Sequence, residues 1–216
     1  MFGVSDPVSL FILIGLLGLL PFIVVLTTSY VKLAVIFGLV RSALGIQQVP
    51  PMIAMNGLAI ILTLYIMAPV GFSAFNALQE KGVDITGGDA IETVVEVAKE
   101  PFRSFLVKHS SLKERTFFTK STKILWPATD SQGVTTEDFL VVIPAFAISE
   151  LTKAFEIGFL LYLPFIAIDL IISNILLAMG MMMVSPLTIS LPFKLFLFVM
   201  IDGWTKLIHG VILTYQ

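Results

Sequence analysis

Two long runs without a charged residue constrain the fold of this chain more than any other feature. They extend over residues 7–31 and 42–79, and both exceed the roughly 20 apolar residues that a membrane-spanning helix needs. A third apolar run, residues 170–193, is interrupted by the segment GMMMVSP at 180–186. The runs predict hydrophobic helices in or against a membrane.

Composition supports this assignment and excludes several classes of protein. The chain is 57% hydrophobic and only 13% charged, against about 25% charged in ordinary soluble domains. Its mean hydropathy is +0.98. A formal charge of -2 without a cluster of lysine or arginine argues against a nucleic-acid partner, and the absence of cysteine excludes disulfides and thiolate metal sites.

Charge divides the chain into three predicted domains. Residues 80–138 hold eight of the 13 basic and ten of the 15 acidic residues, and form a polar insert. Residues 1–79 precede it as an amino-terminal apolar hairpin, and residues 139–216 follow it as a carboxy-terminal hairpin. The expected fold class is therefore all-α: membrane-associated helical hairpins with proline-broken helices and a small polar helical insert.

Prolines and charges place the expected helices within these domains. We expect a block over residues 7–40 that bends at Pro21, a stiff connection over 44–51, and a block over 52–78 with Pro69 near its end. In the insert, the spacing of one group of charged residues predicts a surface helix; these are Glu92, Glu96, Lys99 and Arg103. The third block begins near Phe139 and the fourth follows Pro186.

Flanking charges indicate the orientation of the first hairpin. Lys32 and Arg41 flank the end of the first block, and the connection that follows contains no acid, so this side should be cytoplasmic. The insert then lies outside. Residues 1–7 contain no lysine or arginine, and no small-residue cleavage site follows the apolar run, so we expect a retained helix rather than a signal peptide.

A methionine segment separates the last two apolar blocks. Gly180, Ser185 and Pro186 favour the end of one helix and the start of another. Between them Met181, Met182 and Met183 cannot share one helical face, and their flexible thioethers form a deformable apolar surface. Alternatively, the three methionines only fill gaps at the junction.

Charged residues within the apolar blocks are the second candidate site. Glu150, Lys153 and Glu156 are spaced three apart on one predicted helical face. Because charge is costly within a bilayer, such groups should face water, each other or partner subunits. The same reasoning applies to Lys32, Asp169 and Lys194, and predicts obligate assembly. Alternatively, Glu150 and its neighbours form a satisfied pair at the membrane boundary, and Asp202 with Lys206 forms a local helix pair.

Several ordered motifs together resemble one family. They are PAFAISELTKAFEIGF at 144–159, LPFIAIDL at 163–170, GMMMVSP at 180–186, Asp202-Gly203-Trp204, and RSALGIQQVPP at 41–51. These motifs resemble the SctR/FliP family, the core export-gate subunits of type III secretion systems in injectisomes and flagella. The likeness covers nearly the whole chain outside the insert, and is closer to the Ysc-type injectisome members.

This resemblance implies a function that needs no enzyme chemistry. It implies a homo-oligomer that joins SctS and SctT, and beyond them SctU and SctV, in a ring or cone around a path for unfolded secreted polypeptides. The subunit would be located in the bacterial inner membrane, in contact with its lipids, and the insert would lie on the periplasmic side. Met181, Met182 and Met183 would form a gasket, and no cofactor, metal or catalytic residue is implied.

The residues also allow two other functional classes, an enzyme and a transporter. A membrane enzyme would need a catalytic constellation, but the two histidines, His109 and His209, lie in different blocks without ligand spacing. A self-contained ion-coupled transporter could use Glu150, Asp169 and Asp202 as a relay. The lack of internal repeats and the short chain argue against the transporter.

Overall fold

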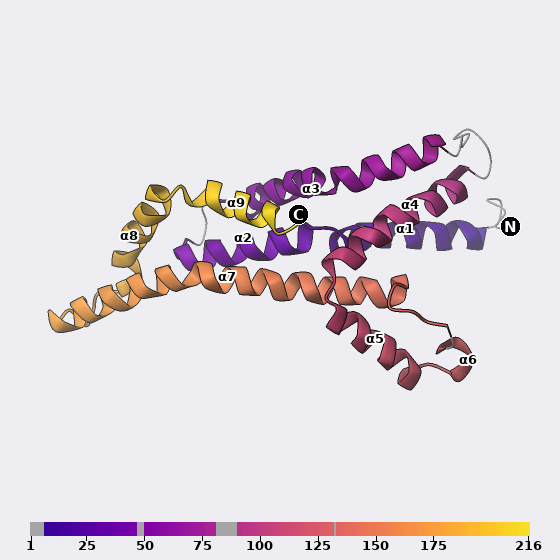
Figure 1. Cartoon of the computed structure of the whole chain (residues 1–216). Helices are drawn as coiled ribbons and strands as arrows, with labels where there is room; N and C mark the ends of the chain where they lie inside the picture. The colour runs from indigo at the N-terminus through magenta and orange to yellow at the C-terminus, as the bar shows by residue number, and fades with distance from the viewer. Residues whose placement is uncertain (1–6, 47–49, 81–89, 132) are drawn as a thin grey trace. The chain divides into compact units, whose positions relative to one another are not determined.

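The computed structural model describes residues 7–46, 50–80, 90–131 and 133–216, and this part of the chain contains nine α-helices and no strand (Figure 1). The prediction of an all-α fold is confirmed. The helices are α1 (Pro7–Thr27), α2 (Tyr30–Leu44), α3 (Met52–Glu80), α4 (Ala90–His109), α5 (Leu112–Leu125), α6 (Ala128–Ser131), α7 (Phe139–Ala178), α8 (Pro186–Met200) and α9 (Gly203–Leu213). The expectation of a retained amino-terminal helix partly concerns residues 1–6, and that of a stiff connection partly concerns residues 47–49. Both segments lie outside the described residues.

Two helices, α3 and α7, are long and apolar enough to cross a membrane. Two further pairs pass the same test together but are bent at a short break: Pro21–Thr27 with α2, and α8 with α9. In each of the two helices α3 and α7, only 11% of an 18-residue apolar stretch is buried within the protein. The chain is therefore a membrane protein whose apolar surface is largely uncovered by its own residues.

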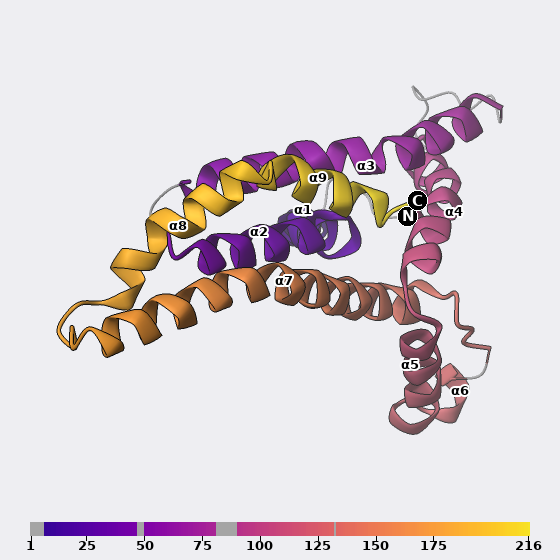
Figure 2. The same cartoon turned by 60° about the vertical axis from the view of Figure 1, so that its left-hand side comes forward.

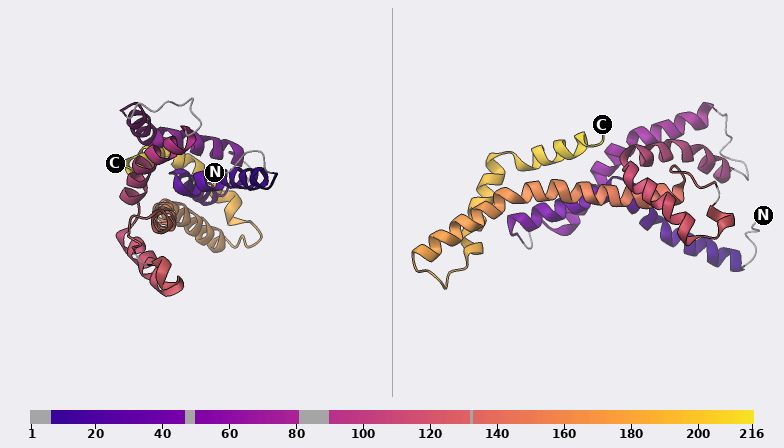
Figure 3. Two further views of the ribbon diagram at one scale, coloured as in Figure 1. Left: turned by 90° about the vertical axis from the view of Figure 1, so that its right-hand side faces the viewer. Right: turned by 60° about the horizontal axis from the view of Figure 1, so that its bottom comes forward.

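The described helices divide into two compact units. The first unit comprises residues 1–31 and 70–148, and the second comprises residues 32–69 and 149–216. Helices α3 and α7 contribute to both, and α7 is the long continuous helix in Figure 3.

The apolar block expected over residues 7–40 is two helices rather than one. Helix α1 contains Pro21, where we expected a bend, and continues to Thr27, and the break before α2 falls at residues 28–29. The hydroxyls of Thr27 and Thr28 donate to the carbonyls of Ile23 and Val24, at 2.6 and 2.8 Å. Such hydroxyls compete for the carbonyls of the preceding turn, which favours a helix end here.

The polar insert is helical, as predicted. Glu96 and Glu100 pair with Lys99 and Arg103 along the exposed side of α4, with N–O distances of 2.5 and 2.7 Å. The other side of α4 packs on the first turns of α7, where Phe105 lies 5.7 Å from Phe146 between ring centroids. Leu106 of α4 and three aliphatic residues near the start of α7, Val141, Val142 and Ala145, are also buried.

The second unit is built around α2. Its buried residues Leu33, Ile36, Phe37 and Val40 follow the spacing of one helical face. In Figures 1 and 2, α2 lies between α7 and α9. A Cβ at Gly158 of α7 would overlap the Leu39 side chain, so glycine is what permits this close approach of α7 to α2.

Helices α8 and α9 are separated by a 61° bend that the sequence analysis did not predict. We expected Asp202 and Lys206 to form a pair within one helix. Instead Asp202 precedes α9 and adopts a left-handed conformation, with φ 52°. Gly203 follows because a Cβ there would overlap the ring of Phe198, which packs edge-to-face on Trp204 at 5.4 Å.

Candidate functional site

The methionine segment forms the tip of a hairpin between α7 and α8 (Figure 2). Gly180 has φ 72°, its N–H donates to the Leu177 carbonyl at 3.0 Å, and the Met181 N–H donates to the Leu176 carbonyl at 2.9 Å. This bonding is the Schellman pattern that ends a helix at a left-handed glycine. Ser185 and Pro186 then occupy the cap and first position of α8, where proline's missing N–H costs nothing.

The methionine side chains at this tip point away from the protein's own core. Met181 is 40% exposed, Met182 is 81% exposed, and Met183 is fully exposed. A methionine that fills a gap at a helix junction is buried by the residues around that gap. The geometry of this chain alone therefore gives no support to the gap-filling alternative.

One charged cluster fastens the hairpin behind the tip. Lys194 Nζ of α8 lies 2.6 Å from Asp169 Oδ2 of α7, and Ser190 Oγ donates to Asp169 Oδ1 at 2.6 Å. Lys194 and Ser190 are buried. Lys194 also donates to the Ala43 carbonyl at 3.1 Å, in the last turn of α2, where a cation satisfies a free carbonyl and the helix dipole. The cluster joins three helices at one point.

A second cluster surrounds the fully buried pair of Lys32 and Glu150. Lys32 Nζ lies 3.0 Å from Glu150 Oε2, donates to Thr214 Oγ1 at 3.2 Å, and lies 3.8 Å from the centroid of the Tyr215 ring. The Tyr215 hydroxyl donates to Glu150 Oε2. Burial raises the pKa of Tyr215, and the Glu150 carboxylate raises it further, so the hydroxyl keeps its proton. This cluster holds the carboxy-terminal residues on α2 and α7.

The remaining charged candidates lie toward the surface. Lys153 Nζ is 3.6 Å from Glu150 Oε1, beyond hydrogen-bond distance, and its side chain is 41% exposed. Glu156 and Asp202 are exposed. Glu150 and Asp169 belong to separate clusters, each with its own lysine, so the arrangement gives no support to a relay between them.

Sequence reasoning missed several members of these clusters. Ser190 precedes Lys194 by one helical turn, a spacing that could have suggested a shared face. Thr214 and Tyr215 follow the last helix, and no local pattern connects them with Lys32. The two histidines belong to different units: His109 is buried in the first, and His209 is exposed in the second. Within the described ranges, no three His, Asp or Glu side chains are placed to hold a metal ion.

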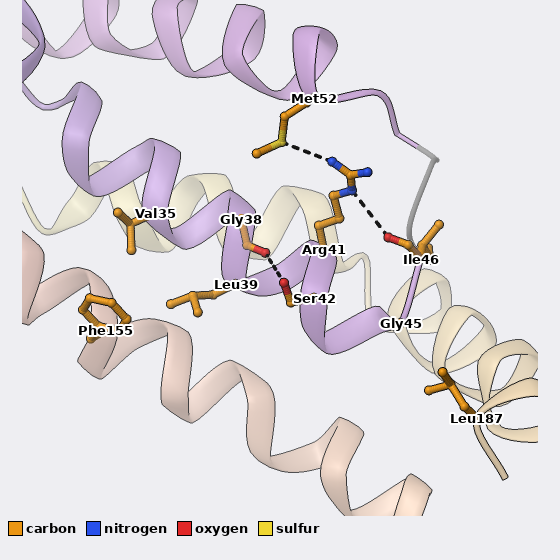
Figure 4. Close-up of a pocket in the computed structure, with 10 residues that line it drawn as sticks. All are labelled: Val35, Gly38, Leu39, Arg41, Ser42, Gly45, Ile46, Met52, Phe155 and Leu187. Carbon is orange, nitrogen blue, oxygen red and sulfur yellow. Dashed lines mark hydrogen bonds between the residues drawn. The ribbon is translucent and has the colours of Figure 1, made fainter. Parts of the chain in front are cut away.

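A groove in the second unit lies beside the end of α2 (Figure 4). It has a volume of about 660 Å³, and Leu39, Phe155 and Leu187 are among its apolar walls. Among the ten described residues that line it, Arg41 alone is ionisable. Arg41 contacts Met52 Sδ at 3.2 Å and donates to the Ile46 carbonyl at 3.4 Å, so it connects the end of α2 with the start of α3. The groove offers an apolar surface and lacks an acid–base pair.

Comparison with known proteins gives full-length matches. The sequence model of the FliP family matches residues 13–211. Yop proteins translocation protein R of Yersinia pestis is 55% identical over 215 residues, which cover 100% of this chain and 99% of the relative. Virulence protein YscR of Salmonella typhimurium is 49% identical, with 93% of each chain covered. Hypersensitivity response secretion protein HrcR of Ralstonia nicotianae is 46% identical, with 96% and 97% covered.

Proposed function

The chain belongs to the FliP family, and from this premise we propose that it is a core subunit of the type III secretion export gate. Copies of the chain assemble with SctS and SctT, and further with SctU and SctV, around a path for unfolded polypeptides. The assembly lies in the bacterial inner membrane, with the polar insert, residues 80–138, on the periplasmic side. The names of the relatives in Yersinia and Ralstonia, which refer to translocation and secretion, support this role.

The observation that carries the proposal is the exposure of the methionine tip. Three flexible apolar side chains stand at the end of a hairpin whose two helices are fastened together by Asp169, Ser190 and Lys194. Exposed apolar side chains gathered in one place indicate a surface that other molecules cover. Copies of the tip around a common axis would cover one another.

Such a ring closes a channel by a simple physical effect. An apolar constriction expels water and so blocks ions, because an ion cannot enter without its hydration shell. Methionine side chains are unbranched and polarisable, so they can rearrange around a passing polypeptide of varied sequence. In this proposal Met181, Met182 and Met183 form the seal, and Gly180, Ser185 and Pro186 fix the turn that presents it.

The charged residues have two roles in this proposal. Lys32 with Glu150 and Asp169 with Lys194 hold the helices behind the tip in place, since each pair is made within the chain. Lys153 and Glu156, which are more exposed, lie at contacts between subunits. The ion pairs within the chain thus hold the tip in place in each copy, and the exposed charges contribute to assembly.

The test is the ion conductance of the assembled gate in planar bilayers. Replacing Met181, Met182 and Met183 together by alanine should leave assembly intact and open a leak to small ions, because most of the apolar volume at the constriction is removed. A matched control with leucine at the same three positions keeps the volume and should stay closed. An alanine variant that assembles fully and conducts no more than the parent would place the seal elsewhere.

A further inference from the structure

Helix α5 has an unusual distribution of side chains for a helix in water. It buries Thr122, which is 6% exposed, and leaves Ile124 82% exposed. Leu112, Phe117 and Leu125 are also exposed. In Figures 1 and 2, α5 projects away from α4 within the first unit. A helix that buries threonine and exposes its large apolar residues needs an apolar surface outside this chain.

The exposed stripe of α5 alternates cations with apolar side chains. Lys113, Phe117, Lys120 and Ile124 are spaced four, three and four residues apart, so they lie along one face, and all four are exposed. The helix carries Lys113, Arg115, Lys120 and Lys123 against a single acid, Glu114. A partner for this stripe must therefore offer negative charge and apolar contact within a few ångströms of each other.

We propose that α5 lies on the surface of an anionic phospholipid membrane, with Phe117 and Ile124 in the boundary of the acyl chains and the lysines at the phosphates. A bilayer interface supplies both chemistries along the full length of a helix. Lysine side chains are long enough to reach phosphates while their methylene stems remain beside the apolar anchors.

Two features of the residues that follow α5 favour a bilayer over a protein partner. Trp126 follows α5 directly, and tryptophan is enriched at membrane–water interfaces. After a short segment the chain then continues into α7, which is apolar enough to span a membrane. This inference goes beyond the export-gate function and requires only that the chain reside in a membrane.

The experiment uses single cysteines in the full-length chain, which has none of its own. Ile124→Cys reports on the stripe, and Ser104→Cys, exposed on α4, is the matched control. Each variant is labelled with an environment-sensitive fluorophore and placed in nanodiscs of phosphatidylcholine, alone or with phosphatidylglycerol. Quenching is measured with nitroxide-labelled lipid and with aqueous iodide.

With phosphatidylglycerol present, the label at position 124 should be quenched by the lipid probe and protected from iodide, and the label at position 104 should be iodide-accessible. High salt should reduce the protection. Adding Lys113→Gln and Lys120→Gln should lower the ratio of membrane-bound to detached α5 by about fivefold per lysine. Both lysines are exposed, so these changes leave the core of the first unit untouched.

Two results would overturn the proposal. In the first, the label at position 124 behaves like the label at 104 in both lipid mixtures. In the second, the label at position 124 is protected regardless of lipid composition, and the unlabelled Ile124→Cys variant forms disulfides between copies, which would make the stripe a contact with a second copy of the chain. Neither result bears on the methionine seal, which is tested by conductance.

Discussion

Lys32 is among the largest of the fully buried side chains in the described part of the chain, and its charge must be satisfied inside the protein. Glu150, Thr214 and the ring of Tyr215 do so at 3.0, 3.2 and 3.8 Å. Removing one member of a buried ion pair costs about 3–5 kcal/mol because the other charge is left uncompensated, whereas replacing both members by apolar residues is often nearly neutral. The pair therefore makes a specific prediction about stability.

Glu150→Gln should lower the free energy of unfolding by about 3–5 kcal/mol, since Lys32 would keep its charge without a counter-ion. The double variant Lys32→Met with Glu150→Leu should recover most of this loss. Glu96→Gln on α4, which weakens an exposed pair, should change stability by about 0.5 kcal/mol or less. Thermal unfolding in detergent, followed by circular dichroism, measures all three; equal melting of Glu150→Gln and the parent would show that the pair contributes nothing.

The residues of the candidate site show where sequence reasoning ends. The spacing of Glu150 and Lys153 suggested a pair, because a helix makes residues three apart into neighbours. The structure places Lys153 Nζ at 3.6 Å from Glu150, and the closer cation is Lys32, from a helix far away in the sequence. Periodicity describes one helix at a time, so contacts such as Lys32 with Tyr215 could not be predicted from it.

At the scale of helices, hydropathy over long stretches predicted where the long helices lie, whereas local residue types predicted only some of the helix breaks. The apolar run at residues 42–79 predicted the helix that became α3, and the block expected to begin near Phe139 became α7, because a membrane-sized helix depends on its composition more than on individual contacts. The break between α8 and α9 was missed, since Asp202 is neither glycine nor proline and nevertheless adopts φ 52°. That break is stabilised by packing of Phe198 against Gly203 and Trp204, which no local pattern reveals.

Gly203→Ala tests this break. A methyl group at position 203 would lie 2.7 Å from Phe198 Cζ and still closer to other ring atoms, so the ring must move away from Trp204. We expect a loss of about 1–3 kcal/mol, as for other overpacked positions. Gly210→Ala in the same helix is the matched control, because a Cβ there meets nothing within 4 Å and alanine should stabilise the helix by about 0.5–1 kcal/mol. Thermal unfolding of both variants gives the comparison, and opposite signs are expected; a Gly203→Ala variant as stable as the parent would contradict the packing account.

At the scale of the whole molecule, this chain leaves much of its apolar surface uncovered by its own residues. The apolar stretches of α3 and α7 are mostly not buried by the protein, and the methionine tip is exposed. Lipid can cover the flank of a helix, but the proposed function requires that other copies cover the tip. The distances between copies at the tip therefore test the assembly as well as the seal.

Met182→Cys places the only thiol of the chain at the tip, so any disulfide must join two copies. If the tips meet around one axis, mild oxidation of the assembled complex should give covalent dimers, because a disulfide forms only when the Cα atoms approach within about 7 Å. Met200→Cys is the matched control: the same substitution, also at an exposed methionine, but at the other end of α8 and about 20 Å from the tip along the helix. Non-reducing gels should show dimers for Met182→Cys and few for Met200→Cys, and only while the complex is assembled. Equal cross-linking at both positions would indicate side-by-side packing of the hairpins without a shared axis at the methionines, and absence of cross-linking in an intact assembly would remove Met182 from the seal.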